Sequence, residues 1–124
     1  MSLVPENLQY TKDHEWALVE KGAATIGITD HAQRELGDIV FVELPKVGTQ
    51  VEAGQTFGTI EAVKTVAELY APVAGVVTEV NAALATDAGV VNQDPYGKGW
   101  ILKIAVENSA SDELMSAAEY TKLI

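Results

Sequence analysis

Short apolar runs separated by glycines and other turn residues dominate the chain. The strongest run covers residues 38–44, where branched and aromatic side chains favour a strand and Pro45 ends it. Several short strands with regular turn signals predict a mainly β fold, either an antiparallel sandwich or a flattened barrel. The other expected strands are 24–28, 56–63, 66–71, 75–80 and 100–106.

A short internal helix is expected at residues 29–36, between the strands 24–28 and 38–44. Asp30 followed by Gln33 resembles a capping box at its start. Gly37 supplies a residue that tolerates the left-handed conformation in which many helices end.

A second helix is expected near the C-terminus, at about residues 111–121. Ser111 can cap it, and the acids that follow suit the positive first turn of a helix. Leu114, Met115 and Ala118 would give this helix one apolar stripe that packs on the β core.

A weak internal repeat divides the strands into two halves. Residues 37–42 resemble residues 75–80 at an offset of 38, and residues 58–63 resemble residues 99–104 at an offset of 41. Two copies of one strand-turn-strand unit around a pseudo-two-fold axis would explain this repeat, although generic β patterning also produces part of it.

Composition narrows the class of protein. The length of 124 residues fits a single domain, 1–124, and the net charge of −10 argues against nucleic acid and membrane surfaces as partners. The acids are scattered, so solubility is the ordinary explanation, and steering toward basic partners is the functional one. There is no cysteine, and His14 and His31 lack the spacing of a helical metal site. Thiolate chemistry and metal binding are therefore not expected.

Lys64 is the residue with the most interesting position. It is the only base between Lys46 and Lys98 and lies between two predicted strands, at the expected tip of a hairpin. A solvated charge is the commonest fate of such a lysine, and the pattern alone favours it. A buried catalytic amine is disfavoured because a tip offers little desolvation. An attachment point for a prosthetic group fits, since a modifying enzyme needs the amine to protrude.

Five motifs, in order over about 100 residues, favour an attachment point over a solvated charge for Lys64. They are 10–16 (YTKDHEW), 27–33 (GITDHAQ), 36–45 (LGDIVFVELP), 61–64 (EAVK) and 92–100 (NQDPYGKGW). Together they resemble the glycine cleavage H-protein family, whose members carry lipoate. Biotin carriers share the fold but usually flank their lysine with methionines, whereas Val63 and Thr65 stand here. Lipoyl domains of acyltransferases usually have an acid before the lysine and lack the His-Glu-Trp segment.

The resemblance implies a hammerhead fold of two pseudo-symmetric halves, with a carrier core at about 22–106 and lipoate on Lys64 in amide linkage. It implies a non-catalytic carrier, expected to be monomeric. The implied partners are a pyridoxal-phosphate glycine decarboxylase, a tetrahydrofolate-dependent aminomethyltransferase, a dihydrolipoyl dehydrogenase and a lipoate-attaching enzyme. The expected location is the cytoplasm for a bacterial chain, or the mitochondrial matrix for a processed eukaryotic one.

The resemblance also implies a surface cleft that shelters the loaded arm from water. Carboxylates there would hold the ammonium by charge-assisted hydrogen bonds. The matching positions are Glu15 and Glu68, with Asp13 a weaker candidate, and both histidines are expected to be structural. The stretch 65–72 departs from the family, since Glu68 stands where a shorter aspartate is common. A divergent lipoyl or biotin carrier of another pathway therefore stays open as the alternative.

Overall fold

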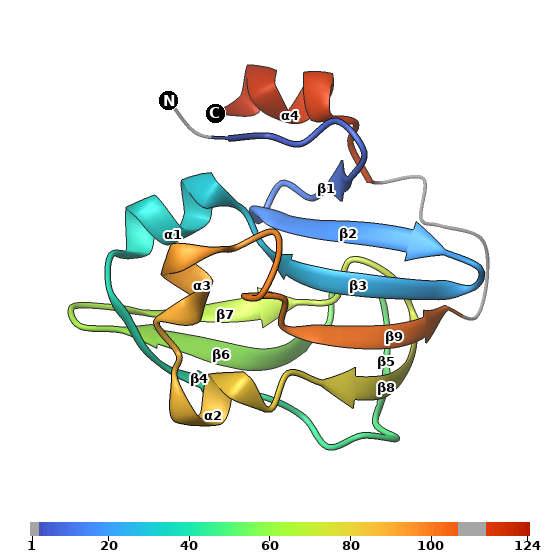
Figure 1. Ribbon diagram of the computed structural model, residues 1–124. Helices are drawn as coiled ribbons and strands as arrows, with labels where there is room; N and C mark the ends of the chain where they lie inside the picture. The colour runs from blue at the N-terminus through green and yellow to red at the C-terminus, as the bar shows by residue number, and fades with distance from the viewer. Residues whose placement is uncertain (1–2, 107–113) are drawn as a thin grey trace.

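The computed structural model describes residues 3–106 and 114–124, which form two β-sheets with four helices around them (Figure 1). The strands are β1 (Gln9–Tyr10), β2 (Glu15–Glu20), β3 (Ala23–Ile28), β4 (Ile39–Glu43), β5 (Gln50–Val51), β6 (Thr56–Ala62), β7 (Val66–Tyr70), β8 (Gly75–Val80) and β9 (Leu102–Val106). The helices are α1 (Asp30–Leu36), α2 (Ala83–Thr86), α3 (Val90–Gln93) and α4 (Ala117–Leu123). None of the helices in the described residues is long and apolar enough to cross a membrane.

The two sheets are antiparallel and open. The larger has the strand order β1-β2-β3-β9-β8-β5 and the smaller has the order β4-β6-β7. The main hydrophobic core lies between them because alternate residues of each strand face inward. Ala17 and Ile26 form one inward pair of the larger sheet, and the row Val42, Ile60 and Ala67 crosses the smaller one. The prediction of a mainly β sandwich is confirmed, as an open sandwich rather than a closed barrel.

The internal repeat corresponds to two equivalent antiparallel pairs, β4 with β6 and β8 with β9. Each pair has a bulge at the same place, between Ile39 and Phe41 in β4 and between Val77 and Glu79 in β8. Ile39 faces Ala62, and its counterpart Val77 faces Ile104. The first strands are thus related by the predicted offset of 38, but the second strands by 42 rather than 41.

A second, smaller cluster covers the outer face of the larger sheet, below α4 (Figure 1). Trp16 faces outward here because its neighbour Ala17 faces inward. The Trp16 indole lies over Gly27, where any Cβ would collide with the ring. Tyr120 of α4 is fully buried in this cluster and stacks on Tyr10 with ring centroids 4.8 Å apart. The chain ends are therefore packed onto the sheet by aromatic contacts.

The C-terminal helix starts later than the sequence pattern predicted. It begins at Ala117, because Ser116 and Glu119 form a capping box in which each side chain accepts the other's backbone N–H. Leu114 is not helical, and Met115 forms an isolated antiparallel β-bridge with Tyr10 through two backbone hydrogen bonds. The proposed cap, Ser111, lies outside the described residues. Tyr120, rather than the predicted apolar stripe with the exposed Ala118, anchors the helix.

Other local expectations also need correction. Thr29, not Asp30, caps α1 by accepting the Ala32 N–H, while the Asp30 carboxylate accepts hydrogen bonds from the side chains of Gln33 and Arg34. Strands β1, β2 and β5 and the single-turn helices α2 and α3 had no clear signal in the pattern. Each end of the predicted strands and of the first predicted helix lies within two residues of the end in the structure.

Gly75 should tolerate no side chain, because a Cβ there would overlap the Ala105 carbonyl of the neighbouring strand. We expect Gly75→Ala to lower the free energy of unfolding by more than about 2 kcal/mol, since backbone cannot move aside cheaply. Gly89→Ala is the matched control, because its Cβ would meet only the Asp87 side chain, at 3.4 Å. Urea denaturation measures both, and equal stabilities would contradict the expected backbone clash.

Candidate functional site

Lys64 lies in the turn between β6 and β7, which projects from one end of the molecule (Figure 1). Its side chain is exposed, and its Cε is 3.8 Å from where a Cβ on Gly37 would be. The turn is held by two backbone hydrogen bonds. Ala62 N–H donates to Thr65 O at 2.8 Å, and Val63 N–H donates to Asp38 O at 3.0 Å. The Lys64 side chain is thus open to solvent, on a turn held by hydrogen bonds.

A cleft of about 150 Å³ lies beside this hairpin, and we call it the hairpin cleft. It is lined by Asp13, His14, Glu15, Ile28, Ala32, Glu35, Leu36, Ile60, Ala67, Glu68 and Leu69. Its walls are mostly apolar, and acids from three elements lie at its border. Glu15 and Glu68 thus both line this cleft, Glu15 from its buried side and Glu68 from the exposed strand at its border. Glu68 follows Lys64 by four residues, which is about 13 Å along a strand.

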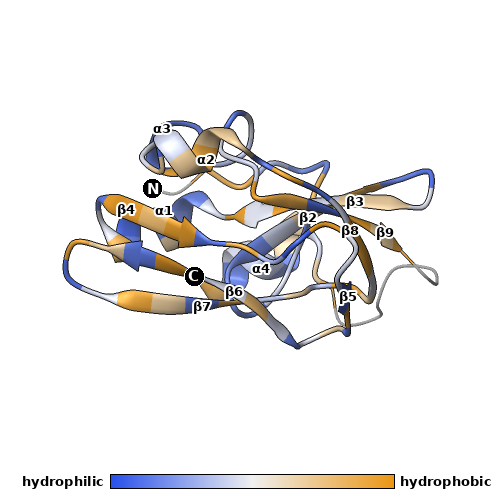
Figure 2. Cartoon of the chain, turned by 90° about the horizontal axis from the view of Figure 1, so that it is seen from below, coloured by the Kyte–Doolittle hydropathy of each residue, from blue (hydrophilic) through white to orange (hydrophobic). Residues whose placement is uncertain are grey.

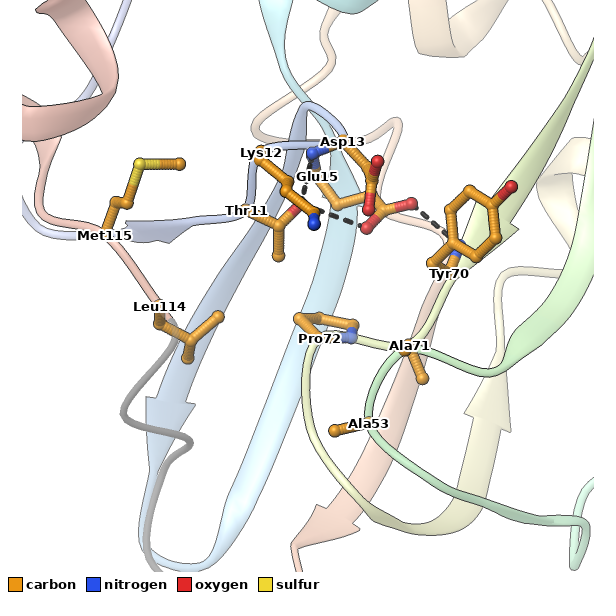
Figure 3. Close-up of a pocket in the computed structure, with 11 residues that line it drawn as sticks. Thr11, Lys12, Asp13, Glu15, Ala53, Tyr70, Ala71, Pro72, Leu114 and Met115 are labelled. Atoms are coloured by element: carbon orange, nitrogen blue, oxygen red, sulfur yellow. Dashed lines mark hydrogen bonds between the residues drawn. The ribbon is translucent and has the colours of Figure 1, made fainter. Parts of the chain in front are cut away.

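Glu15 is buried, with 2% of its surface exposed. It opens β2 and faces inward, on the same side as Ile28 opposite it. Figure 3 shows its carboxylate between Thr11 and Tyr70: Thr11 Oγ1 donates to Oε1 at 3.1 Å, and Tyr70 N–H donates to Oε2 at 2.7 Å. Glu15 thus joins the larger sheet to the backbone of β7, the edge strand of the smaller one.

Burial also changes the chemistry of Glu15. Loss of hydration raises the pKa of its carboxyl from 4.5 to about 8, against the opposing effect of the two hydrogen bonds. At neutral pH the group is therefore mostly protonated. A cation brought beside it would favour the charged form and release the proton.

Glu68 differs from Glu15 because it is exposed. It lies on β7 at the border of the hairpin cleft, and its Oε2 accepts a hydrogen bond of 3.0 Å from the Tyr70 hydroxyl. This contact with Glu68 raises the pKa of Tyr70. Asp13 and Glu35, both exposed, add two more acids to the border. Sequence reasoning missed Glu35 because it lies on the helix rather than next to the lysine.

His14 connects the cleft to the C-terminal helix. Its backbone has a φ of 67° in the turn before β2, and its Nδ1 is 2.8 Å from the Tyr120 hydroxyl. That hydroxyl is also 2.7 Å from Thr29 Oγ1, the cap of α1. Burial first, and then the nearby His31, lower the pKa of His14. These contacts agree with the expected structural role of His14. Tyr120 was missed, because only packing brings it 106 residues back to His14.

Removing the Tyr120 hydroxyl should loosen this junction. We expect Tyr120→Phe to lower the free energy of unfolding by about 1–2 kcal/mol, because buried Thr29 and half-buried His14 each lose a hydrogen-bond partner. Tyr70→Phe is the control, since it removes only an exposed hydroxyl contact, with Glu68, and should leave stability unchanged. Equal thermal midpoints for Tyr120→Phe and wild type would contradict a role for the hydroxyl.

A larger cavity of about 700 Å³ lies on the other side of Glu15, between the segment Ala71–Pro72 and the pair Leu114 and Met115 (Figure 3). Tyr70 lines it and follows Lys64 by six residues, about 20 Å along the strand. The hairpin cleft is therefore the cavity nearer to Lys64, and Glu15 lines both cavities.

Comparisons with known proteins show the family of this chain. A model of the family described as glycine cleavage H-protein matches residues 8–124. The glycine cleavage system H protein of Rubrobacter xylanophilus is 56% identical over 122 residues, which cover 98% of this chain and 95% of that protein. The H protein of Chlorobium limicola is 60% identical over 124 residues, covering 98% of this chain and 97% of that protein.

A solved structure extends the agreement to the fold. The crystal structure of a glycine cleavage system H protein from Mycobacterium marinum matches with a TM-score of 0.90 and 41% identity, over 96% of this chain and 97% of that one. Sequence and fold thus agree over almost the full length, and the chain belongs to the glycine cleavage H-protein family, the carrier component of the glycine cleavage system.

Proposed function

We propose that Lys64 carries lipoate in amide linkage and that the chain works as the lipoyl carrier of glycine cleavage. The observation that carries this proposal is the exposed Lys64 on a hydrogen-bonded turn beside a cleft bordered by acids. When bound, the lipoyl group supplies a dithiolane that accepts an aminomethyl group and two electrons. The chain contributes the anchor, the shelter and the charges.

The residues present fit such a group. A lysine extended by a lipoyl chain spans roughly 15 Å from Cα to the first sulfur, at about 1.25 Å per bond along a zigzag chain. Glu68 is about 13 Å from Lys64 along the strand, so the reach and the cleft match. Ile60, Ala67 and Leu69 give the cleft an apolar wall suited to methylene groups.

The two cleft carboxylates have different roles in this proposal. Glu68 is exposed and accepts an ammonium directly by a charge-assisted hydrogen bond. Glu15 lies deeper, already bonded to Thr11 and Tyr70, and becomes charged when an ammonium approaches. Asp13 and Glu35 add negative potential at the border. Keeping the amine protonated removes the lone pair that would otherwise expel the sulfur.

The proposed partners are the enzymes that load, unload, reoxidise and modify the arm: glycine decarboxylase, aminomethyltransferase, dihydrolipoyl dehydrogenase and a lipoate-attaching enzyme. The carrier is proposed to be a single-domain monomer. A cytoplasmic location is proposed because the relatives named above are bacterial proteins. Tethering explains the advantage, because a bound intermediate meets its next enzyme at high effective concentration.

Intact mass spectrometry tests the cofactor and its site. Chain produced in a lipoate-fed host should gain the mass of one lipoyl group, in the peptide that contains Lys64, and chain from a lipoate-deficient host should not. A streptavidin signal would instead support the alternative of a biotin carrier. No adduct, or an adduct on another lysine, would contradict the proposal.

The lifetime of the aminomethyl-loaded chain tests Glu68. We expect Glu68→Gln to shorten this lifetime several-fold at pH 7, because the ammonium loses a charged partner. Glu79→Gln is the control, since that acid pairs with Lys103 at 3.7 Å in the other sheet. Following loaded chain by mass after removal of the decarboxylase gives the rate, and equal lifetimes would exclude Glu68 from arm protection.

A further inference from the structure

Four large hydrophobic side chains are exposed around Lys64. Val40 is 57% exposed, Phe41 48%, Val63 75% and Val66 58%, and we call these four the collar. Among the described residues, four other large hydrophobic side chains are exposed: Leu3, Val47, Leu123 and Ile124. Of these, three belong to the ends of the chain and one to the loop before β5.

The strand register places the collar at the lysine end of the smaller sheet, with Glu61 among its apolar members. Phe41 faces Glu61, and Glu61 faces Val66, so these three form a row on the outer face of the smaller sheet. Val40 lies in the bulge beside this row, and Val63 is next to Lys64 in the turn. Figure 2 shows apolar segments on β4 and on the hairpin next to the turn. The collar is separate from the core, because the inward row is a different set of residues.

On the same outer face, the next row away from the Lys64 turn carries two acids. It consists of Glu43, Thr59 and Glu68, which face one another across the three strands. The outer face thus has an apolar front at the lysine end and carboxylates behind it, in a chain of net charge −10. A cluster of exposed apolar side chains with carboxylates among and behind them is typical of a protein docking site.

We propose that the collar is the docking surface for the enzyme that attaches the lipoyl group, an inference that rests on the proposed function. The enzyme it fits has an apolar rim around its active-site entrance, with one lysine or arginine within the rim to meet Glu61 and another farther from the entrance to meet Glu43. In the attachment step the Lys64 amine attacks the carbonyl carbon of an activated lipoyl acyl donor. The C–N bond forms as the bond to the leaving group breaks, and the amine loses a proton to solvent.

Reach selects this enzyme over the other partners. A lysine amine extends only about 6 Å from its Cα, so an enzyme that acts on the amine must press against the turn itself. Val63 and Val66 lie within two residues of Lys64 and are inside any such contact. Enzymes that act on the lipoyl sulfurs work roughly 15 Å from the Cα and need not touch the collar.

The test compares modification rates of collar variants. Purified unmodified chain is incubated with a lipoate ligase, lipoate and ATP, and adduct formation is followed by intact mass. We expect the double variant Val63→Ser and Val66→Ser to raise the KM for the chain at least tenfold without changing its thermal midpoint, since both side chains are exposed. Val63→Ile, which keeps the apolar surface, should behave as wild type. Val47→Ser, at a residue 59% exposed and outside the collar, is the control.

A second measurement separates docking of this enzyme from other uses of the collar. Variants modified to completion with excess ligase should be loaded by glycine decarboxylase at the wild-type rate. A KM within twofold of wild type for the double variant, or an equal rise for Val47→Ser, would overturn the proposal. Slowed loading with normal modification, or a dimer that the double variant abolishes, would assign the collar to another occupant. Absence of any adduct on wild-type Lys64 would instead contradict the proposed function itself.

Discussion

Replacing Lys64 by arginine is expected to abolish lipoyl attachment and, with it, glycine cleavage. Arginine keeps the positive charge and the exposure of the turn, but its guanidinium does not form the amide at neutral pH. Wild-type chain should shift from a net charge of −10 to −11 on modification, because an amide replaces an ammonium. Without the tether, transfer between the enzymes should fall by roughly 10²–10⁴-fold, the advantage that effective concentration provides.

Glycine-dependent formation of the one-carbon product, measured with the other three enzymes supplied, checks this result. Lys46→Arg is the matched control, because it changes another exposed lysine, one that follows the end of β4 remote from the Lys64 turn. Its activity and its adduct mass should equal those of wild type. A Lys64→Arg chain that still carries lipoate, or that still supports turnover, would remove Lys64 from the proposed role.

Replacing Glu15 by glutamine is expected to stabilise the chain at alkaline pH and to remove a pH dependence of stability. The pKa of Glu15 is about 8 in the folded chain and 4.5 ordinarily, so the folded state holds an extra proton between these values. Wild-type stability should therefore fall as pH rises from 4.5 to 8, by about 3–5 kcal/mol for a group this buried. Glutamine resembles the protonated acid and cannot ionise, so Glu15→Gln should not show this fall.

Urea denaturation of wild type and Glu15→Gln at pH 5, 7 and 8.5 measures the difference. The comparison isolates Glu15, because the lowered pKa of His14 acts in both proteins and in the opposite direction, with stability lost as pH falls. Glu15→Ala should lack the pH dependence but be less stable throughout, since the Tyr70 N–H loses its acceptor. Parallel pH profiles for wild type and Glu15→Gln would show that Glu15 stays charged in the folded chain.

Most strands were predictable because period-two burial and β-branched side chains mark them. β2 was missed for a physical reason: its inward positions include a charged residue, Glu15, whose burial depends on Thr11 and Tyr70 from other segments. A local pattern cannot show such a contact. The start of α4 was misplaced because acids after Ser111 resemble a first turn, while the capping box that forms uses Ser116 and Glu119.

The candidate site was predictable in part. The isolation of Lys64 was visible in the sequence, but its role depended on motifs spread along the whole chain. The assignment of Glu15 and Glu68 to a cleft came from the family resemblance and not from the residue pattern. The position of Glu35 on α1 and the contact of Tyr120 with His14 depend on how distant segments pack. The collar was also hidden, because Phe41 and Val66 become neighbours only through their shared partner Glu61.

The pairing of β3 with β9 has a consequence for biosynthesis. The smaller sheet is built from residues 39–70 alone. In the larger sheet, Ile26 of β3 can pair with Leu102 of β9 only after Leu102 has been synthesised. During translation the hairpin that bears Lys64 emerges well before the strand that completes the opposite sheet. A nascent or prematurely terminated chain ending before Leu102 would expose the inner faces of both sheets and be prone to aggregate. Truncated translation products should therefore be substrates for chaperones and proteases rather than smaller working carriers.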